Sequence, residues 1–190
     1  MRLLRLGQDL PLKEKTVVCL GFFDGVHIGH RELIERAVSI GAHNRLKVCV
    51  HTFDTMPVRV INPDADVLEL TPLAEKALLL EALGVDILAV SAFDGEVMHM
   101  RAKAFFHDIL LEKLSARHIV AGFHHRFGYR GEGDVAMLAD MCSQAGIGLD
   151  VVQPVTLPGG ELISSTAIRQ AIRAGDIARA ERMLGRSWRG

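Results

Sequence analysis

The 190-residue sequence is poor in the residues that define several specialised classes of protein. It has only 3 cysteines, Cys19, Cys49 and Cys142, which lie far apart and have no partner at metal-ligand spacing. It has only 6 prolines, and it contains no internal repeat, low-complexity tract or Ser/Pro-rich linker. A disulfide-stapled, repeat or disordered protein is therefore excluded, and we expect one globular domain with buried free thiols.

The sequence also lacks an excess of charge of either sign and a long apolar run. A formal net charge of −1 provides no broad basic field for nucleic acid or an anionic membrane surface. No apolar run approaches the roughly 20 residues that span a bilayer, and residues 1–6 do not resemble a secretory signal. We expect a cytoplasmic protein, and its net charge is compatible with a small anionic ligand in a local pocket, while its oligomeric state stays open.

What the sequence does contain is a regular alternation of two patterns. Short apolar runs predict strands at residues 17–20, 47–53, 87–92, 118–121 and 149–152. Segments of helical period predict helices at residues 26–42, 73–83, 102–114 and 135–144, with Gly84 and Gly146 at helix ends. This alternation is typical of an α/β protein with a parallel sheet and helices on both faces.

The C-terminal part follows a turn at residues 157–160 and has a different pattern. Residues 164–184 predict two short helices that are broken near Gly175 and Asp176. We therefore expect one domain over residues 1–186, followed by a tail over residues 187–190.

The segment Gly-Phe-Phe-Asp-Gly-Val-His-Ile-Gly-His at residues 21–30 joins the first predicted strand to the first predicted helix. Ligands of parallel α/β sheets bind at such junctions, and a helix N-terminus attracts phosphate. His27 and His30 fall on one helix face, where two imidazoles can donate hydrogen bonds to phosphoryl oxygens. Gly29 leaves room for a nucleotide, although glycine costs a helix about 1 kcal/mol. Asp24 fits either a helix cap or a metal or substrate ligand.

A second candidate segment, Ile-Ser-Ser-Thr-Ala-Ile-Arg at residues 163–169, begins the first C-terminal helix. Ser164 and Ser165 can cap free backbone N–H groups at its start. Arg169 projects from the same face as Ser165, and its forked guanidinium suits phosphate oxygens. A capped surface helix would show the same pattern, but its occurrence with the first segment favours a second contact to phosphate.

Together the two segments resemble the nucleotidyltransferase superfamily, which handles ATP with a His-x-Gly-His motif. The longer form closely resembles the flavin adenylyltransferase module of bacterial riboflavin kinase/FAD synthetases, over nearly the whole chain. The resemblance implies a Rossmann-like nucleotidyltransferase fold with a short C-terminal helical segment. It also implies transfer of AMP from ATP to FMN, giving FAD, with Mg²⁺ bound largely through the substrate phosphates and no dedicated metal site. The family joins this module to a C-terminal riboflavin kinase domain, and the resemblance implies that these 190 residues correspond to the adenylyltransferase module alone.

The same resemblance assigns residues to the substrates. His27, His30 and Arg169 would act in catalysis. The residues implied for ATP binding are Gly21, Phe22, Phe23, Asp24, Gly25, Gly29, Ser164, Ser165 and Thr166. The residues implied for flavin binding are Phe53, Pro57, Phe123, His124 and Phe127.

The flavin side departs from the family pattern. The loop after the second strand reads Phe-x-Pro-His-Pro in the family and Phe-Asp-Thr-Met-Pro at residues 53–57 here. The later loop reads Gly-x-Asp/Asn-Phe-x-Phe-Gly in the family and Gly-Phe-His-His-Arg-Phe-Gly at residues 122–128 here, with His124 at the amide or carboxylate position. Its phenylalanines fit either ring stacking on a flavin or a place in the core.

These departures leave two alternatives to FAD synthesis. One is a related nucleotidyltransferase with a different phosphorylated acceptor. The other is a catalytically silent module that binds a flavin or a nucleotide.

Overall fold

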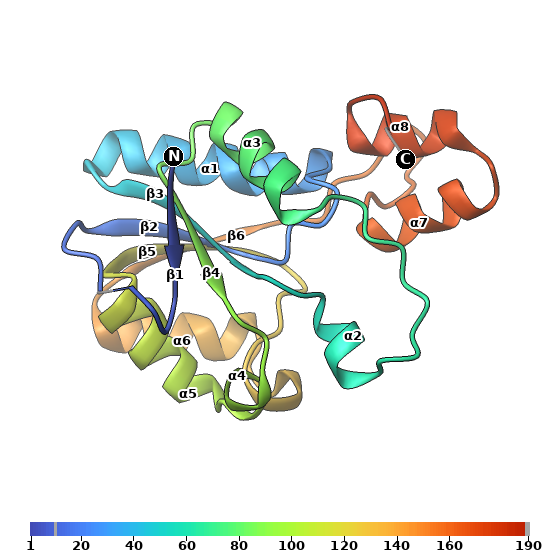
Figure 1. Cartoon of the computed structure of the whole chain (residues 1–190). Helices are drawn as coiled ribbons and strands as arrows, with labels where there is room; N and C mark the ends of the chain where they lie inside the picture. Colours follow the sequence, from blue (N-terminus) through green and yellow to red (C-terminus); the bar gives the residue numbers. More distant parts are fainter. Residues whose placement is uncertain (10, 189–190) are drawn as a thin grey trace.

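A computed structural model describes residues 1–9 and 11–188. Its centre is a six-stranded sheet in the order β1-β4-β3-β2-β5-β6, and all neighbouring strands are parallel (Figure 1). The strands are β1 (Arg2–Arg5), β2 (Thr16–Leu20), β3 (Lys47–Phe53), β4 (Ile87–Ser91), β5 (Ala116–Gly122) and β6 (Gly148–Val152). The predicted parallel α/β architecture is confirmed.

Helices cover both faces of this sheet. Those on the described chain are α1 (Ile28–Asn44), α2 (Pro57–Ile61), α3 (Leu73–Ala82), α4 (Gly95–His99), α5 (Ala102–Ala104), the π-helix η1 (Phe105–Lys113), the 3₁₀ turn η2 (Tyr129–Gly131), α6 (Val135–Ala145), α7 (Ser165–Arg173) and α8 (Ile177–Leu184). Helices α1 and α3 lie on one face, and α5, η1 and α6 lie on the other (Figure 1). The central strands β2 and β4 are therefore fully buried, as is typical of a parallel sheet, whereas the edge strands β1 and β6 are partly exposed.

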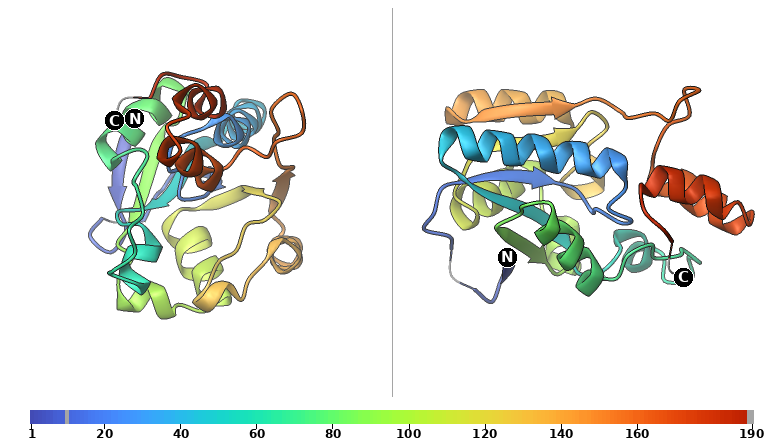
Figure 2. Two further views of the ribbon diagram at one scale, coloured as in Figure 1. Left: turned by 90° about the vertical axis from the view of Figure 1, so that its right-hand side faces the viewer. Right: turned by 90° about the horizontal axis from the view of Figure 1, so that it is seen from above.

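The interior consists of separate apolar clusters. One includes Ile34 of α1 and Leu80 of α3, and another includes Leu110 of η1 and Leu138 of α6. A third cluster joins α7 and α8, for example through Met183. Figure 2 shows from above that these two helices lie beyond the carboxyl ends of the strands. The C-terminal pair thus has its own core and sits at the edge where ligands of such sheets bind.

Four elements were not predicted from the sequence: β1, α2, α4 and the 3₁₀ turn η2. Strand β1 buries only Leu4, and it is held at the sheet edge by pairing with β4. Helices α2 and α4 bury none of their residues, so they lack the apolar stripe that reveals a helix in a sequence. The helix predicted over residues 102–114 is present, but it winds as a π-helix from Phe105 onward.

The remaining predictions for the scaffold agree with the structure within a few residues. The break between α7 and α8 falls at Gly175 and Asp176 as expected, and Gly146 caps α6 with a φ of 65°. Cys19, Cys49 and Cys142 are buried and free. In residues 1–9 and 11–188, no helix has the length and apolarity needed to cross a membrane. The tail expected over residues 187–190 lies partly outside the described residues.

Strand β2 is the topological switch point of the sheet, where the order of the strands reverses. The chain proceeds from β2 to β3 on one side, while β5 pairs with the other side of β2. A crevice opens beside the carboxyl end of such a strand because the connections leave it in opposite directions. The segment after β2 is therefore placed to meet a ligand.

Candidate active site

The turn between β2 and α1 has an unusual backbone. Phe23, Gly25 and Val26 have φ angles of 56°, 89° and 38°. This left-handed region suits glycine but strains the other two residues, whose side chains are buried and hold the turn in place. Strained backbone of this kind gathers at ligand-binding sites.

His27 and His30 come together at the start of α1, as predicted from their spacing. Their rings stack with centroids 3.6 Å apart and an angle of 14° between the planes. His27 is the N-cap of α1, because its Nδ1 accepts a hydrogen bond of 3.2 Å from the backbone N–H of His30. The ring proton of a neutral His27 must therefore reside on Nε2, where it can be donated to a ligand.

Both imidazoles are held neutral by their surroundings. Burial lowers the pKa of His27 to about 4, with further lowering by the charges of Arg169 and Arg186. Burial also lowers the pKa of His30 well below its usual range, and nearby His27 and Lys76 add to this effect. Nδ1 of His30 is buried without a hydrogen-bond partner among the residues described. At neutral pH these rings can act as hydrogen-bond donors or acceptors but carry no charge.

Asp24 is the centre of the turn rather than a helix cap. Its buried carboxylate accepts hydrogen bonds from the backbone N–H groups of Leu70 and Thr71 at 2.9 to 3.2 Å. It also pairs with Arg169, whose Nε donates to the carbonyl oxygen of Leu68 at 2.7 Å. The capping alternative considered for Asp24 is thus wrong, because His27 occupies that position.

The second predicted segment packs directly on the first. The Ser165 hydroxyl donates a 2.7 Å hydrogen bond to the backbone oxygen of Asp24, while Ser164 caps α7 through the N–H of Ala167. Thr166 is exposed at the first turn of α7. The helix starts of α1 and α7, both predicted to meet phosphate, therefore lie at the same site.

Two glycines of the turn are close to side chains of the protein itself. A Cβ at Gly21 would lie 3.0 Å from the ring of Phe23, and a Cβ at Gly29 would lie 3.3 Å from the ring of His27. Gly29 therefore makes room for the imidazole, while the space for a nucleotide that the sequence suggested stays a prediction. Either substitution would displace a ring that shapes the site.

Arg186 was not predicted as part of the site. Its Nη1 donates to the backbone oxygen of Gly25 at 2.8 Å, and its Nη2 lies 3.4 Å from the hydroxyl of Thr71. Arg186 directly follows Gly185, the left-handed cap of α8. A cationic residue just after a helix end was therefore the one feature of the sequence that could have drawn attention to it. Nothing in the sequence indicates that this cation folds back onto the turn.

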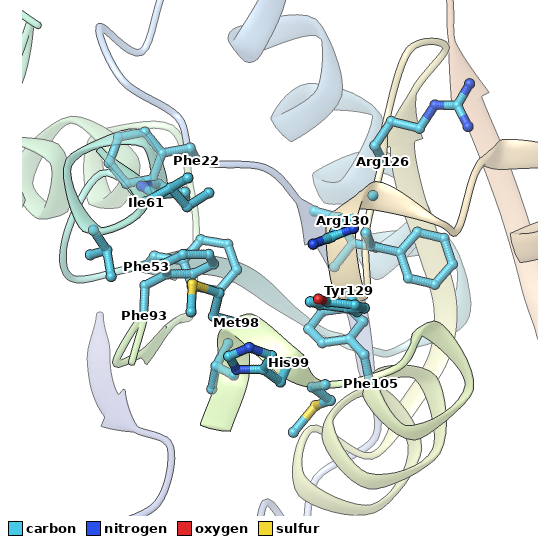
Figure 3. Close-up of a pocket in the computed structure, with 18 of the residues that line it drawn as sticks. Phe22, Phe53, Ile61, Phe93, Met98, His99, Phe105, Arg126, Tyr129 and Arg130 are labelled. Carbon is cyan, nitrogen blue, oxygen red and sulfur yellow. The ribbon is translucent and has the colours of Figure 1, made fainter. Parts of the chain in front are cut away.

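A cavity of about 810 Å³ opens next to the turn. Gly21 and Phe22 line it, together with three of the predicted flavin residues, Phe53, Pro57 and Phe127. Figure 3 shows two facing walls. One wall carries Phe22, Phe53, Ile61 and Phe93, and the other carries Phe105, Tyr129 and Arg130. The space between them suits a flat aromatic ring system.

The other two residues predicted for flavin binding lie outside the lining of this cavity. The side chain of Phe123 is 51% exposed, and its ring contacts His124 at a centroid distance of 5.1 Å. The next residue, His125, lines the cavity instead. Sequence reasoning missed it, although the family pattern quoted above has phenylalanine at this position.

Two histidines of the cavity lining, His51 and His125, are neutral. Burial lowers the pKa of His51 to about 3 and that of His125 to about 4, so both are uncharged at neutral pH. His51 shares a 2.8 Å hydrogen bond with Ser91. Positive charge reaches the cavity only from the exposed side chains of Arg126 and Arg130 among its described lining. The cavity can therefore hold an apolar ring and attract an anionic substituent at its rim.

No preformed metal centre is found in residues 1–9 and 11–188, where no group of three or more His, Cys, Asp or Glu side chains is placed to hold an ion. The arrangement is suited to chemistry in which phosphate groups are positioned by hydrogen bonds and neighbouring positive charge.

Comparisons with known proteins agree with this geometry. The family model for FAD synthetase matches residues 10–167. A bifunctional riboflavin kinase/FMN adenylyltransferase of Listeria monocytogenes is 39% identical over 170 residues, covering 89% of this chain and 53% of the relative. The corresponding Escherichia coli K12 protein is 36% identical, covering 91% of this chain and 55% of the relative. An FAD synthetase of L. monocytogenes is 35% identical, covering 91% of this chain and 70% of that relative. The chain thus spans about half the length of the bifunctional relatives.

Solved structures support the same fold. A Streptococcus pneumoniae protein described as a macrolide-efflux protein superposes with a TM-score of 0.84 at 30% identity, covering 98% of this chain and 62% of that one. A pantoate-beta-alanine ligase of Francisella tularensis, solved with beta-gamma ATP and beta-alanine, gives a TM-score of 0.55 at 18% identity, with 94% and 79% covered. The second likeness concerns the fold alone. With the family model matched over most of its length, this chain belongs to the FAD synthetase family.

Proposed function

We propose that the chain is an FMN adenylyltransferase, which transfers AMP from ATP to FMN and gives FAD and pyrophosphate. The observation that carries the proposal is the direct connection of two sites by one turn. Gly21 and Phe22 line the aromatic cavity, and His27 at the end of the same turn begins α1. An acceptor ring in the cavity and a triphosphate at the helix start would be neighbours.

The cavity is proposed to hold the isoalloxazine ring of FMN. Its volume of about 810 Å³ lies within the usual range for small-molecule sites. Phe53 and Phe93 pack edge to face with centroids 5.0 Å apart, leaving one wall of the cavity aromatic and stiff. A planar ring would be stacked between this wall and Tyr129, with its phosphate directed toward Gly21.

The proposed reaction needs no nucleophilic residue of the protein. An oxygen of the FMN phosphate attacks the α-phosphorus of ATP, and the bond to the β-phosphate oxygen breaks as pyrophosphate leaves. A phosphomonoester has its second pKa at about 6, so the attacking group is already largely dianionic at neutral pH. The protein is left to position the substrates and stabilise the leaving pyrophosphate.

The residues around the turn are proposed to bind the triphosphate. Nε2–H of His27 and the free N–H groups at the starts of α1 and α7 would donate hydrogen bonds to its oxygens. Arg169 uses two of its five N–H groups for Leu68 and Asp24, which leaves donors for phosphate. Arg169 would thus hold the turn and contact the substrate at the same time.

Mg²⁺ fits this proposal as an ion bound mainly through substrate phosphates and water, because the described residues offer no cluster of ligands for it. When bound, it would neutralise charge on the triphosphate.

A coupled pyrophosphate assay with ATP and a series of acceptors tests the proposal. We expect release of pyrophosphate with FMN and not with riboflavin, which lacks the attacking phosphate, and mass spectrometry should identify FAD. Activity only with another phosphorylated acceptor would support a related transferase. Binding of ATP and FMN without release of pyrophosphate would support a silent binding module.

A further inference from the structure

Helix α3 places a lysine in the interior, behind the turn. Lys76 is only 1% exposed, and lysine is rarely buried to this degree without a charged partner. Its Nζ donates a 2.8 Å hydrogen bond to the backbone oxygen of Phe22 and lies 4.0 Å from the centroid of the Phe22 ring. The cation is therefore attached to the residue that separates the turn from the cavity.

No carboxylate on the described chain forms an ion pair with Lys76. The charges of Asp24 and Glu69 act on it, but Asp24 pairs with Arg169 and Glu69 lies 3.7 Å from Arg59. A buried charge without a close partner is costly, because the lost hydration is not replaced. A bound anion beside the ammonium group would compensate for this lost hydration.

The electrostatic surroundings place this charge at the proposed nucleotide site. Burial lowers the pKa of Lys76 to about 8, so the ammonium form still predominates at neutral pH. The carbonyl that Lys76 binds belongs to Phe22, and the ring centroid of the next residue, Phe23, lies 5.1 Å from that of His30, so the cation is close to the start of α1. A polyphosphate bound there would bring several negative charges toward the buried cation.

We propose that Lys76 is a positioning residue of the nucleotide site: its Nζ fixes the Phe22 carbonyl of the turn, and its buried charge is balanced by a bound polyphosphate. The inference rests on the proposed binding of ATP at this turn. It requires no contact between Lys76 and the substrate, because attraction between charges is strong in an interior that excludes water. The binding of a nucleotide should then depend on Lys76 in proportion to the number of its phosphates.

The structure offers a matched control on the same carbonyl. The Thr52 hydroxyl donates a 2.8 Å hydrogen bond to the backbone oxygen of Phe22, as Lys76 does. Thr52→Val removes one hydrogen bond and no charge, whereas Lys76→Met removes one hydrogen bond and the charge. Comparing the two variants separates the positioning of the turn from its electrostatics.

The experiment is calorimetric titration of the full chain and both variants with adenosine, AMP, ADP and ATP at one salt concentration. Lys76→Met should weaken ATP binding by about 10-fold or more, ADP binding less, and adenosine binding by less than about 2-fold. Thr52→Val should change all four affinities by one common, smaller factor. Urea denaturation should show Lys76→Met to be as stable as the parent chain or more stable, since an uncompensated buried charge is lost.

Equal weakening of all four ligands by Lys76→Met, or unchanged ATP binding, would overturn the inference while leaving the proposed function intact. Failure of the parent chain to bind ATP would contradict the proposed function and this inference with it. If Lys76→Met does not fold, Lys76→Gln keeps a polar group near the carbonyl without the charge, and the same dependence on phosphate number decides the question.

Discussion

The turn after β2 and the aromatic cavity beside it are built in different ways. In the turn, polar groups bind one another: Asp24 holds two backbone N–H groups and Arg169, and Ser165 holds the backbone of Asp24. In the cavity, the walls meet mainly through aromatic rings, such as Phe105 and Phe127 with centroids 5.9 Å apart. Hydrogen-bonded networks depend on each member, whereas packed walls tolerate exchange of one side chain for another.

The sequence reflects this difference. Residues 21–30 of the turn and residues 163–169, which pack on it, match the family pattern quoted above. The departures from that pattern occur in the two loops beside the cavity, where Met56 is buried and His125 forms part of the lining. A substitution in the turn should therefore affect catalysis or folding strongly. One in the cavity should affect acceptor binding alone.

The largest effect is expected for His30→Ala, which tests the turn. Loss of a group proposed to stabilise the transition state should lower turnover by about 10²-fold or more, while FMN binding in the cavity is retained. Pyrophosphate release and flavin fluorescence measure the two quantities. His107→Ala, at an exposed position on η1, serves as the control with parental turnover. Unchanged turnover in the His30 variant would show that the site is wrongly assigned.

Asp24→Asn should have the next largest effect, because it removes one charge of a buried pair and leaves Arg169 unpaired. We expect a loss of about 3 kcal/mol in the free energy of unfolding, measured by urea denaturation. Asp66→Asn is a matched control, since the Asp66 side chain is fully exposed in its contact with Arg173. Equal stability of the two variants would contradict the central position given to Asp24.

The cavity is tested by comparing two phenylalanines. Phe53→Ala removes a wall residue and should weaken FMN binding by about 10-fold without affecting ATP. Phe123→Ala changes a residue outside the lining and should alter FMN binding by less than about 2-fold, within the range of a surface substitution. Titration of protein with FMN measures both. A larger effect at Phe123 would place the flavin elsewhere.

The smallest effect concerns acid stability. His51 and His125 have pKa values lowered from 6.5 to about 3 and about 4, so the unfolded chain binds more protons than the folded chain below pH 6.5. The contribution of these two neutral histidines to the free energy of unfolding is therefore fully present above this pH and is lost as the pH drops toward 4. His125→Phe should reduce the loss between about pH 7 and about pH 5.5 by about 1 kcal/mol. An unchanged pH profile in urea denaturation would show that His125 does not stay neutral in the folded chain.

The scaffold and the turn could be predicted because their signals are local. Apolar runs gave the central strands, and glycines with His27 and His30 at helical spacing gave the turn. The partners of Asp24 could not be predicted, because Leu70 and Thr71 offer only backbone N–H groups, which any residue other than proline carries.

The cavity walls were harder to predict for a related reason. Ile61, His99 and Tyr129 come from α2, α4 and η2, short elements that bury no residue and leave no periodic pattern. They are brought together only by the folded sheet. Lys76 looks like an ordinary polar position of a surface helix until its neighbours in space are known.

The contacts between the turn and the C-terminal residues join parts of the chain that are synthesised at different times. Arg169 follows its partner Asp24 by 145 positions, and Arg186 follows Gly25 by 161. A ribosome therefore synthesises every strand of the sheet before it adds Arg169 and Arg186. Until Arg169 and Arg186 have emerged, the nascent protein has the strands around the proposed site without the two side chains that hold its turn.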